Sequence, residues 1–262
     1  MRPQTPFEPI NLPAHLMADL DDFAETVDFI RLYMTYAWQS DTWPLGFQWM
    51  FQLERSMSQT AQCNYVTKEQ IRRVNHWGRK PNPDGFYAPT GVHMPLYGES
   101  GPDPSLKDDP YRPIERLDTA TTHLGPTYLS KVVMFALPWQ FGAIDSRQVR
   151  VFGRGDPSSQ RHAWLDLRAQ ESVGGGWRIP RTKTLWPEAW RRWINILRYF
   201  AHRLNEERID CPHPRRFVEN GLRWTGRWCC VDVQTALFSY ASVVTDSAPW
   251  PAPTPPDDRA DT

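Results

Sequence analysis

The stretch "SKVVMFALPWQFGAIDSR", residues 130–147, holds an amine and a carboxylate at the two ends of an uncharged run. A buried amine with a lowered pKa can act as a nucleophile, and a positioned carboxylate can stabilise positive charge that develops on a substrate. Lys131 and Asp145 are therefore candidates for a catalytic pair on the floor of a cleft. The competing interpretation is that the run is a buried helix whose ends are marked by the two charges.

The elements that position this pair can be predicted from residues 113–152. The sequence predicts a helix, a tight turn at "LGPT" (124–127), a helix that carries Lys131, the apolar run, and a further helix that directly follows Asp145. In that place Asp145 can cap the helix, and the backbone N–H groups that bind the cap favour an ionised carboxylate. Around the turn, at Gly125 and Thr127, the first amides of the next helix are predicted to bind a phosphate group.

This arrangement resembles the helix–hairpin–helix DNA glycosylases, and most closely their 8-oxoguanine-glycosylase-like branch. In that superfamily a hairpin binds the DNA backbone, a Lys lies near the start of the following helix in the bifunctional members, and an Asp begins the next helix. Lys131 in "SK" and Asp145 in "DSR" match those positions. A C-terminal pattern of the branch is matched by Trp228, Asp232, Val233, Ala236, Leu237, Phe238, Tyr240 and Ala241.

The resemblance runs from about residue 113 to residue 242, with departures at the hairpin. Gly125 and Pro126 stand where the superfamily has G-x-G, and the interval between the Lys and the Asp is shorter than in the better-known members. The chain has no cysteine quartet of the iron–sulfur type, so the resemblance implies no such cluster.

The resemblance implies an all-α fold, with room for a small β-hairpin, in which two helical lobes enclose a cleft. It implies hydrolysis of the N-glycosidic bond of a modified or damaged base in double-stranded DNA, in base-excision repair or in defence against phage with modified cytosines. Asp145 would stabilise the oxocarbenium-like sugar and orient or activate water. Lys131 would form a Schiff base that permits strand cleavage, or would only contact phosphate.

Two other classes of function remain open. One is a non-catalytic DNA-binding protein on the same fold, and the other is an enzyme that acts on a nucleoside or another metabolite. The steep salt dependence of phosphate-driven binding would separate DNA binding from metabolite binding.

Further site residues are assigned by their place in these patterns. Ser130 and Arg147 lie next to the catalytic pair and are expected to contact DNA, with Arg147 either on a phosphate or holding the carboxylate. A base that leaves the DNA stack enters a pocket with aromatic walls. The candidates for that pocket are Trp43, Trp49, Tyr128 and Trp224. Because the chain has 13 Trp, each of these is equally a candidate for the core.

Charge is partitioned along the chain although its formal sum is zero. Residues 147–228 contain 17 Lys and Arg against 8 Asp and Glu, whereas both flanking segments are acidic. Such a block, almost entirely Arg, predicts a face that binds the phosphates of DNA, with Arg191 and Arg198 among its contacts. The alternative is that these arginines pair with acidic residues of the N-terminal half.

The remaining composition bounds the class of protein. The 262 residues suffice for a core of one domain or of two lobes. The N-terminus has no basic-then-apolar leader and no run approaches a membrane span, so we expect a cytoplasmic protein. We also expect the protein to act as a monomer. The four cysteines, which are Cys63, Cys211, Cys229 and Cys230, show no C-x-x-C spacing and are expected to be reduced.

Metal binding has one weak signal. Cys211 and His213, in "CPH", could supply two ligands, but no second pair follows at a usual spacing. We therefore expect no metal and no cofactor from the sequence.

Helical periodicity predicts one helical domain over 1–245 and a disordered, Pro-rich tail over 246–262. Apolar spacing predicts helices from 13 to 34, over 44–57, and from Pro187 onward, and Thr67 and Gln70 are in capping-box register at the start of another. Residues 78–113 are predicted to be a long connection with a hairpin inside "GFYAPTGVHMPLYG".

Overall fold

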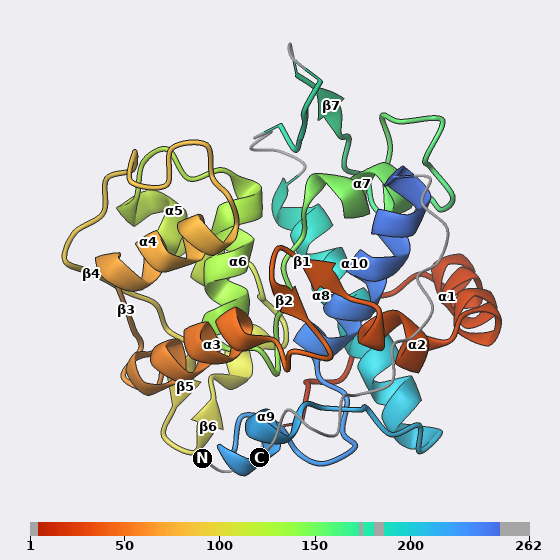
Figure 1. Ribbon diagram of the computed structural model, residues 1–262, viewed down its shortest axis with the longest axis horizontal. Helices are drawn as coiled ribbons and strands as arrows, with labels where there is room; N and C mark the ends of the chain where they lie inside the picture. The colour runs from red at the N-terminus through yellow and green to blue at the C-terminus, as the bar shows by residue number, and fades with distance from the viewer. Residues whose placement is uncertain (1–4, 173–174, 181–185, 247–262) are drawn as a thin grey trace.

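Two groups of helices make up most of the computed structural model, which describes residues 5–172, 175–180 and 186–246. The first group consists of α3 (Gln48–Ala61), α4 (Lys68–Trp77), α5 (Arg112–Ala120) and α6 (Pro126–Ala136). The second group consists of α1 (Ala14–Thr26), α2 (Phe29–Met34), α7 (Ser146–Phe152), α8 (Trp186–Glu206) and α10 (Cys230–Asp246). Figure 1 shows the two groups side by side, and the expected mostly helical fold is confirmed.

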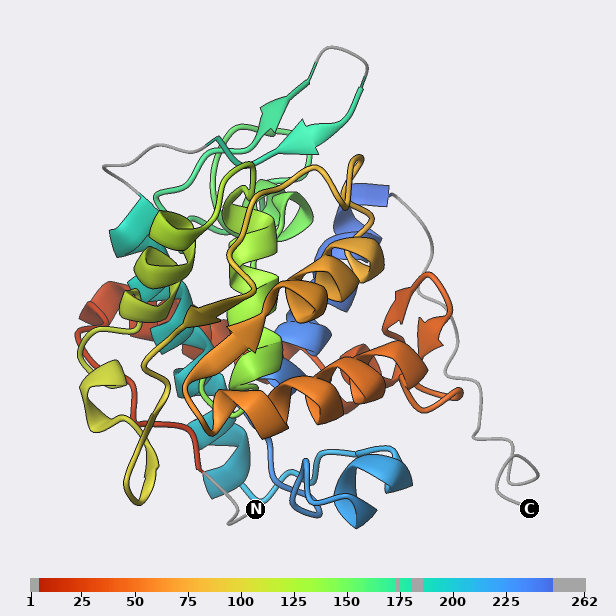
Figure 2. The ribbon, with the colours of Figure 1, turned by 90° about the vertical axis from the view of Figure 1, so that its left-hand side faces the viewer.

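In the first group α6 is the central helix, with α3, α4 and α5 packed around it (Figure 2). Every side chain of α6 from Leu129 to Ala136 is buried, as its apolar sequence requires. The predicted capping box of α4 is present: the Thr67 hydroxyl accepts from the Gln70 amide, and the Gln70 side chain accepts from the Thr67 amide.

In the second group α10 packs against α2, α7 and α8. The predicted apolar stripe of α8 is buried, including Trp190, Trp193 and Leu197, which confirms the helix expected from Pro187. The connection from α8 to α10 carries the short helix α9 (Arg215–Glu219).

Short antiparallel strand pairs and one 3-10 turn lie in the connections between these helices. They are β1 (Ala37–Trp38) with β2 (Asp41–Thr42), β3 (Tyr65–Thr67) with β4 (Gly91–His93), β5 (Tyr97–Gly98) with β6 (Gly101–Pro102), β7 (Gln170–Glu171) with β8 (Trp177–Arg178), and η1 (Pro104–Leu106). Val66 pairs with Val92, and Gly91 lies against the ring of Tyr65, which any larger residue at 91 would overlap.

The helix predicted from 13 to 34 is divided in the structure. Val27 is extended, and the carboxylate of Asp28 starts a new helix, α2, by accepting from the amide of Arg31 at 2.9 Å. Asp, Asn, Ser and Thr favour the cap positions of helices. An Asp such as Asp28 within an apolar periodic run can therefore end one helix and begin the next.

Two predictions for the next segments are corrected. The helix predicted over 44–57 begins at Gln48, because residues 37–42 form the β1–β2 hairpin and Phe47 adopts a left-handed conformation with φ 50°. The hairpin predicted within residues 85–98 does not form: β4 pairs instead with β3, and the next hairpin joins β5 to β6.

The tail predicted from residue 246 follows the end of α10 at Asp246, and residues 247–262 lie outside the described residues. Within the part of the chain that the structure describes, no helix combines the length and the hydropathy of a membrane span.

Candidate active site between the two helical groups

Lys131 lies in the middle of α6, with its amine enclosed by aromatic rings. Nζ is 5.1 Å from the ring centre of Trp77, 5.3 Å from that of Trp38 and 5.6 Å from that of Tyr128. Gly78 makes room for this enclosure, since a Cβ there would lie 3.0 Å from the Tyr128 ring and 3.3 Å from Nζ. With 6 % of its surface exposed, Lys131 is the only Lys among the buried residues of the described chain.

The surroundings of Lys131 lower the pKa of its amine, which makes the neutral form more accessible. Burial lowers its pKa from the ordinary value of 10.5, Asp145 raises it, Arg147 lowers it, and the net direction is downward. In the same place burial, followed by the charge of Asp145, raises the pKa of Tyr128 to about 12. Because the neutral amine is the nucleophilic form, this environment increases the reactivity of Lys131 at neutral pH.

Asp145 caps α7, as predicted. Its Oδ1 accepts from the backbone amides of Arg147 at 2.9 Å and Gln148 at 3.2 Å. The Gln148 side chain completes a capping box by accepting from the Asp145 amide at 3.0 Å. These bonds fix the carboxylate at the N-terminus of the helix, where the helix dipole favours a negative charge.

Ser130 links the helix of Lys131 to the segment that ends at Asp145. Its hydroxyl accepts from the amide of Ile144 at 3.2 Å and donates to the carbonyl of Thr127 at 2.9 Å. The side chain is completely buried, so the expectation that Ser130 contacts DNA is wrong. Ser130 instead holds the two site-bearing elements at a fixed separation.

Lys131 and Asp145 line one small cavity between the helical groups. Its volume of about 10 Å³ is the space of roughly one water molecule, so the cavity is closed to a nucleobase in this conformation. The first group contributes Trp77 and Lys131, the second contributes Asp145, Gln148, Gln234 and Phe238, and the connecting segments contribute Tyr36, Trp38 and Ala143.

The β1–β2 hairpin closes one side of this cavity and lies between the two groups in Figure 1. Trp38 Nε1 and Gln39 Nε2 both donate to the carbonyl of Trp77, at 2.9 and 2.6 Å. Arg147 lies 5.6 Å from the ring centre of Trp38 and forms an ion pair with Asp246 at 3.4 Å. Arg147 is therefore beside the site, and its contact with a phosphate stays a prediction.

Of the four predicted pocket aromatics, Tyr128 alone lies beside Lys131. Trp43 donates to a backbone carbonyl at 2.7 Å and lines a separate groove beside α9. Trp49 is exposed on α3, and the exposed Trp224 packs edge-on against Trp139. Trp43, Trp49 and Trp224 therefore do not line the cavity of Lys131 and Asp145, and their contact with a base stays a prediction.

The aromatic residues that line the cavity were not predicted from the sequence. They are Tyr36, Trp38, Trp77 and Phe238. Phe238 belongs to the C-terminal pattern that carries the resemblance, and this pattern is a signal for its place at the cavity. Nothing in the sequence distinguishes Tyr36, Trp38 and Trp77 from the other aromatic residues, because contacts between distant segments place them here.

The turn before α6 is open, as a backbone-binding turn must be. Gly125 immediately precedes the helix, Pro126 begins it, and a Cβ at Gly125 would meet no atom within 4 Å. Because Pro126 has no N–H group, the half-buried Thr127 supplies the first amide of the helix. Phosphate binding at Gly125 and Thr127 stays a prediction.

Arg198, an expected DNA contact, is instead an internal residue. It is fully buried, and its guanidinium donates to the carbonyls of Leu106 and Lys107 at 2.8 and 2.9 Å. Burial lowers its pKa to about 10. Its assignment to a DNA-binding face is therefore wrong, whereas Arg191 is partly exposed, pairs with Asp109 at 3.1 Å and remains a candidate.

Other arginines of the block pair with acids of the N-terminal half, as the alternative interpretation predicts. Arg203 pairs with Asp21, and Arg223 binds both carboxylate oxygens of Glu54 at 2.7 and 2.9 Å. These pairs reduce the charge that the block can present to DNA.

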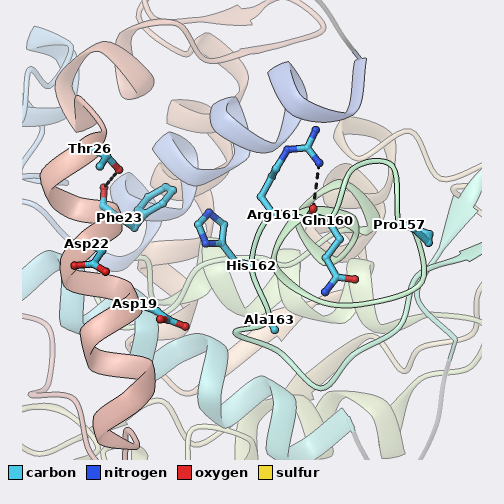
Figure 3. Close-up of a pocket in the computed structure, with 9 residues that line it drawn as sticks. All are labelled: Asp19, Asp22, Phe23, Thr26, Pro157, Gln160, Arg161, His162 and Ala163. Carbon is cyan, nitrogen blue, oxygen red and sulfur yellow. Dashed lines mark hydrogen bonds between the residues drawn. The ribbon is translucent and has the colours of Figure 1, made fainter.

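A wider hollow of about 680 Å³ lies between α1 and the loop 157–163 (Figure 3). Asp19, Asp22 and Thr26 of α1 face Gln160 and His162 across it. Its described lining offers carboxylates, an imidazole and a guanidinium but no primary amine. The smaller cavity, where an amine and a carboxylate meet, is therefore the better candidate for catalysis.

Comparison of the chain with protein-family models, with curated proteins and with solved structures finds no match.

Proposed function

We propose that this protein is a DNA glycosylase that excises a modified or damaged base, on a helix–hairpin–helix glycosylase-like fold. The observation that carries the proposal is a cavity that a buried amine and a helix-capping carboxylate line together. Base excision needs a negative charge beside the sugar, and a nucleophile at its C1′ carbon. The resemblance around Lys131 and Asp145 supports the same chemistry.

Asp145 acts on the sugar in the proposed reaction. The base leaves with the electron pair of the N-glycosidic bond and takes up a proton, and positive charge develops on C1′ and O4′. Both capping bonds of Asp145 go to Oδ1, which leaves Oδ2 to face this charge. A charge already held in place needs no reorganisation as the barrier is crossed.

Lys131 supplies the nucleophile in the bifunctional form of the reaction. The lone pair of neutral Nζ forms a bond to C1′ as the bond to the base breaks, and one Nζ proton passes to the departing base. The C1′–O4′ bond then breaks as a C1′–Nζ double bond forms, and O4′ takes up the second Nζ proton. Once the resulting imine is protonated, loss of a C2′ proton expels the 3′ phosphate, and water then releases the amine. If water attacks C1′ instead, the enzyme is a monofunctional hydrolase.

Entry of a base requires the cavity to widen. The β1–β2 hairpin is the cover at this point, and its Trp38 and Gln39 side chains bond to a single carbonyl, that of Trp77. Displacement of Trp38 would leave a space with aromatic walls and with the amide of Gln234, a group that can both donate to and accept from the edge of a base.

The test uses duplex oligonucleotides that each carry one oxidised, alkylated, deaminated or sugar-modified base. Released base and abasic sites are measured with the full chain and with Asp145→Asn, which keeps a cap-forming side chain but removes the charge. We expect release from one class of duplex, and a loss of about two orders of magnitude or more in the variant. The matched control is Asp28→Asn, which alters the cap of α2 and should leave the rate unchanged.

The other outcomes identify the alternatives. Tight binding of duplexes without release of any base supports a non-catalytic DNA-binding protein. Cleavage of free nucleosides without action on duplexes supports a metabolite enzyme, and excision by Asp145→Asn at the wild-type rate reduces Asp145 to a helix cap.

A further inference from the structure

A second cluster of chemically active side chains lies at the start of α10. Cys211 Sγ, His213 Nδ1 and a carboxylate oxygen of Asp232 lie within 4.8 Å of one another. Sγ is 3.5 Å from Nδ1, and Nδ1 is 4.0 Å from Asp232 Oδ1. All three side chains are buried. A thiol, an imidazole and a carboxylate that converge in this way are the ligand types of zinc sites.

The hydrogen bond on the far side of the imidazole fixes its tautomer. His213 Nε2 lies 2.9 Å from the carbonyl oxygen of Arg227. A carbonyl only accepts, so Nε2 carries the proton and the lone pair is on Nδ1, directed towards Cys211 and Asp232. A backbone carbonyl in this place is the usual outer partner of a metal-binding histidine.

A buried network of polar bonds holds the Asp232 carboxylate in place. Glu54, Asp232 and Arg223 are all buried, and Arg223 binds Glu54 at 2.7 Å and Asp232 at 3.0 Å. A ligand that is itself hydrogen-bonded in this way is oriented before a metal ion arrives.

The other oxygen of the carboxylate is held from within the fold. Cys229 donates to Asp232 Oδ2 through its amide at 3.1 Å and through its thiol at 2.9 Å, which orients the carboxylate. A thiolate, an imidazole and a carboxylate are poor ligands as a set for magnesium and calcium, which prefer oxygen, and they favour zinc.

We propose that Cys211, His213 and Asp232 form a zinc site that fixes the connection between α8 and α10. No metal was expected from the sequence, because the partner of "CPH" comes from a helix further along the chain. The site clamps residues 211 and 213 of the connection to the first turn of α10, next to the bridge between Cys211 and Gly226.

The test is metal analysis of the full chain, purified from zinc-containing medium and dialysed. We expect about one zinc ion per chain, its replacement by cobalt with a thiolate-to-cobalt charge-transfer band, and a melting temperature that falls by several degrees with a strong chelator. Cys211→Ser and His213→Gln should each lose the metal and the band. The controls are Cys63→Ser and His76→Gln, an exposed cysteine and a partly exposed histidine away from the cluster, which should keep both.

The wild-type measurements decide the matter even if the ligand variants fold poorly. Less than about a tenth of an ion per chain, no cobalt band and no effect of the chelator would overturn the proposal and leave a neutral thiol–imidazole hydrogen bond. If Cys211→Ser and His213→Gln both keep the zinc ion and the cobalt charge-transfer band, the assignment of these residues as ligands is overturned. Base excision is measured separately, since the zinc site does not depend on the proposed glycosylase activity.

Discussion

Lys131 has a location that weakens the folded protein and a property that the proposed chemistry needs. An ammonium that loses its water shell is destabilised by the lost hydration free energy. The cation–π contacts with three aromatic rings offset only part of this loss. The lowered pKa is the expression of this imbalance. Residues kept in an unfavourable environment are concentrated at functional sites, so removal of the charge should have opposite effects on stability and on activity.

Replacement of Lys131 by Met should stabilise the protein. Met fills a similar volume without a charge, and the expected gain is on the order of 1 kcal/mol at neutral pH. Because the folded-state pKa of Lys131 is depressed, the gain is full below that pKa and disappears as the pH rises past the unfolded-state value. Urea unfolding of both proteins at several pH values measures it. A large loss of stability in Lys131→Met would contradict this account of the amine.

Lys131→Gln addresses the chemistry of the same amine. If neutral Nζ attacks C1′, excision by the wild type should increase with pH until the lowered pKa of Lys131 is passed. Borohydride should trap a covalent protein–DNA adduct that Lys131→Gln does not form. Trapping by Lys68→Gln, a control at an exposed lysine, should be normal. An active wild type without an adduct would make the enzyme monofunctional.

At the scale of elements, local signals and tertiary contacts had different predictive value. The capping box at Thr67 was predicted in full, and the cap at Asp145 was predicted without the Gln148 side chain that completes its box. Both were predictable because a capping box lies within four consecutive residues. The β1–β2 hairpin was not predicted, because the side-chain bonds that hold it are made to residues of α3 and α4 and not within the hairpin. Asp41 accepts from Trp77 Nε1 at 2.7 Å and from the amides of Trp49 and Met50 at the start of α3.

The hairpin should therefore behave as a cover for the amine. In the wild type Lys131 should react slowly with an amine-modifying reagent, and Trp38→Ala should raise its rate of modification at least about tenfold, because one ring of the enclosure is removed. Site-resolved mass spectrometry measures the rate, and exposed Lys68 serves as the internal reference. Equal protection of Lys131 in both proteins would show that α4 and α6 alone enclose it.

At the scale of the whole molecule, the sequence showed that basic residues are concentrated in one segment. It did not show which of these residues are exposed and which are paired within the fold. The Arg-rich block is real, yet Arg198 is internal, and Arg203 and Arg223 pair with acids from the opposite end of the chain. No linear pattern distinguishes an arginine that points outward from one that pairs across the fold, because the partner is chosen by tertiary packing. The candidate site shows the same division: Lys131 and Asp145, which the sequence singles out, line one cavity, whereas their aromatic enclosure could not be predicted.

The arginines at the start of α8 provide the test of a DNA-binding face. Arg191 and Arg192 are partly exposed, and Arg191 can exchange its ion pair with Asp109 for a phosphate. Replacement of both by Gln should flatten the slope of log affinity against log salt by about one unit per lost phosphate contact, alike for all duplexes. Arg72→Gln, which removes a partly exposed, ion-paired arginine on α4, is the matched control. If the slope of the double variant equals that of the control, this part of α8 points away from DNA, and DNA binding would have to rely on the turn at Gly125 and on Arg147.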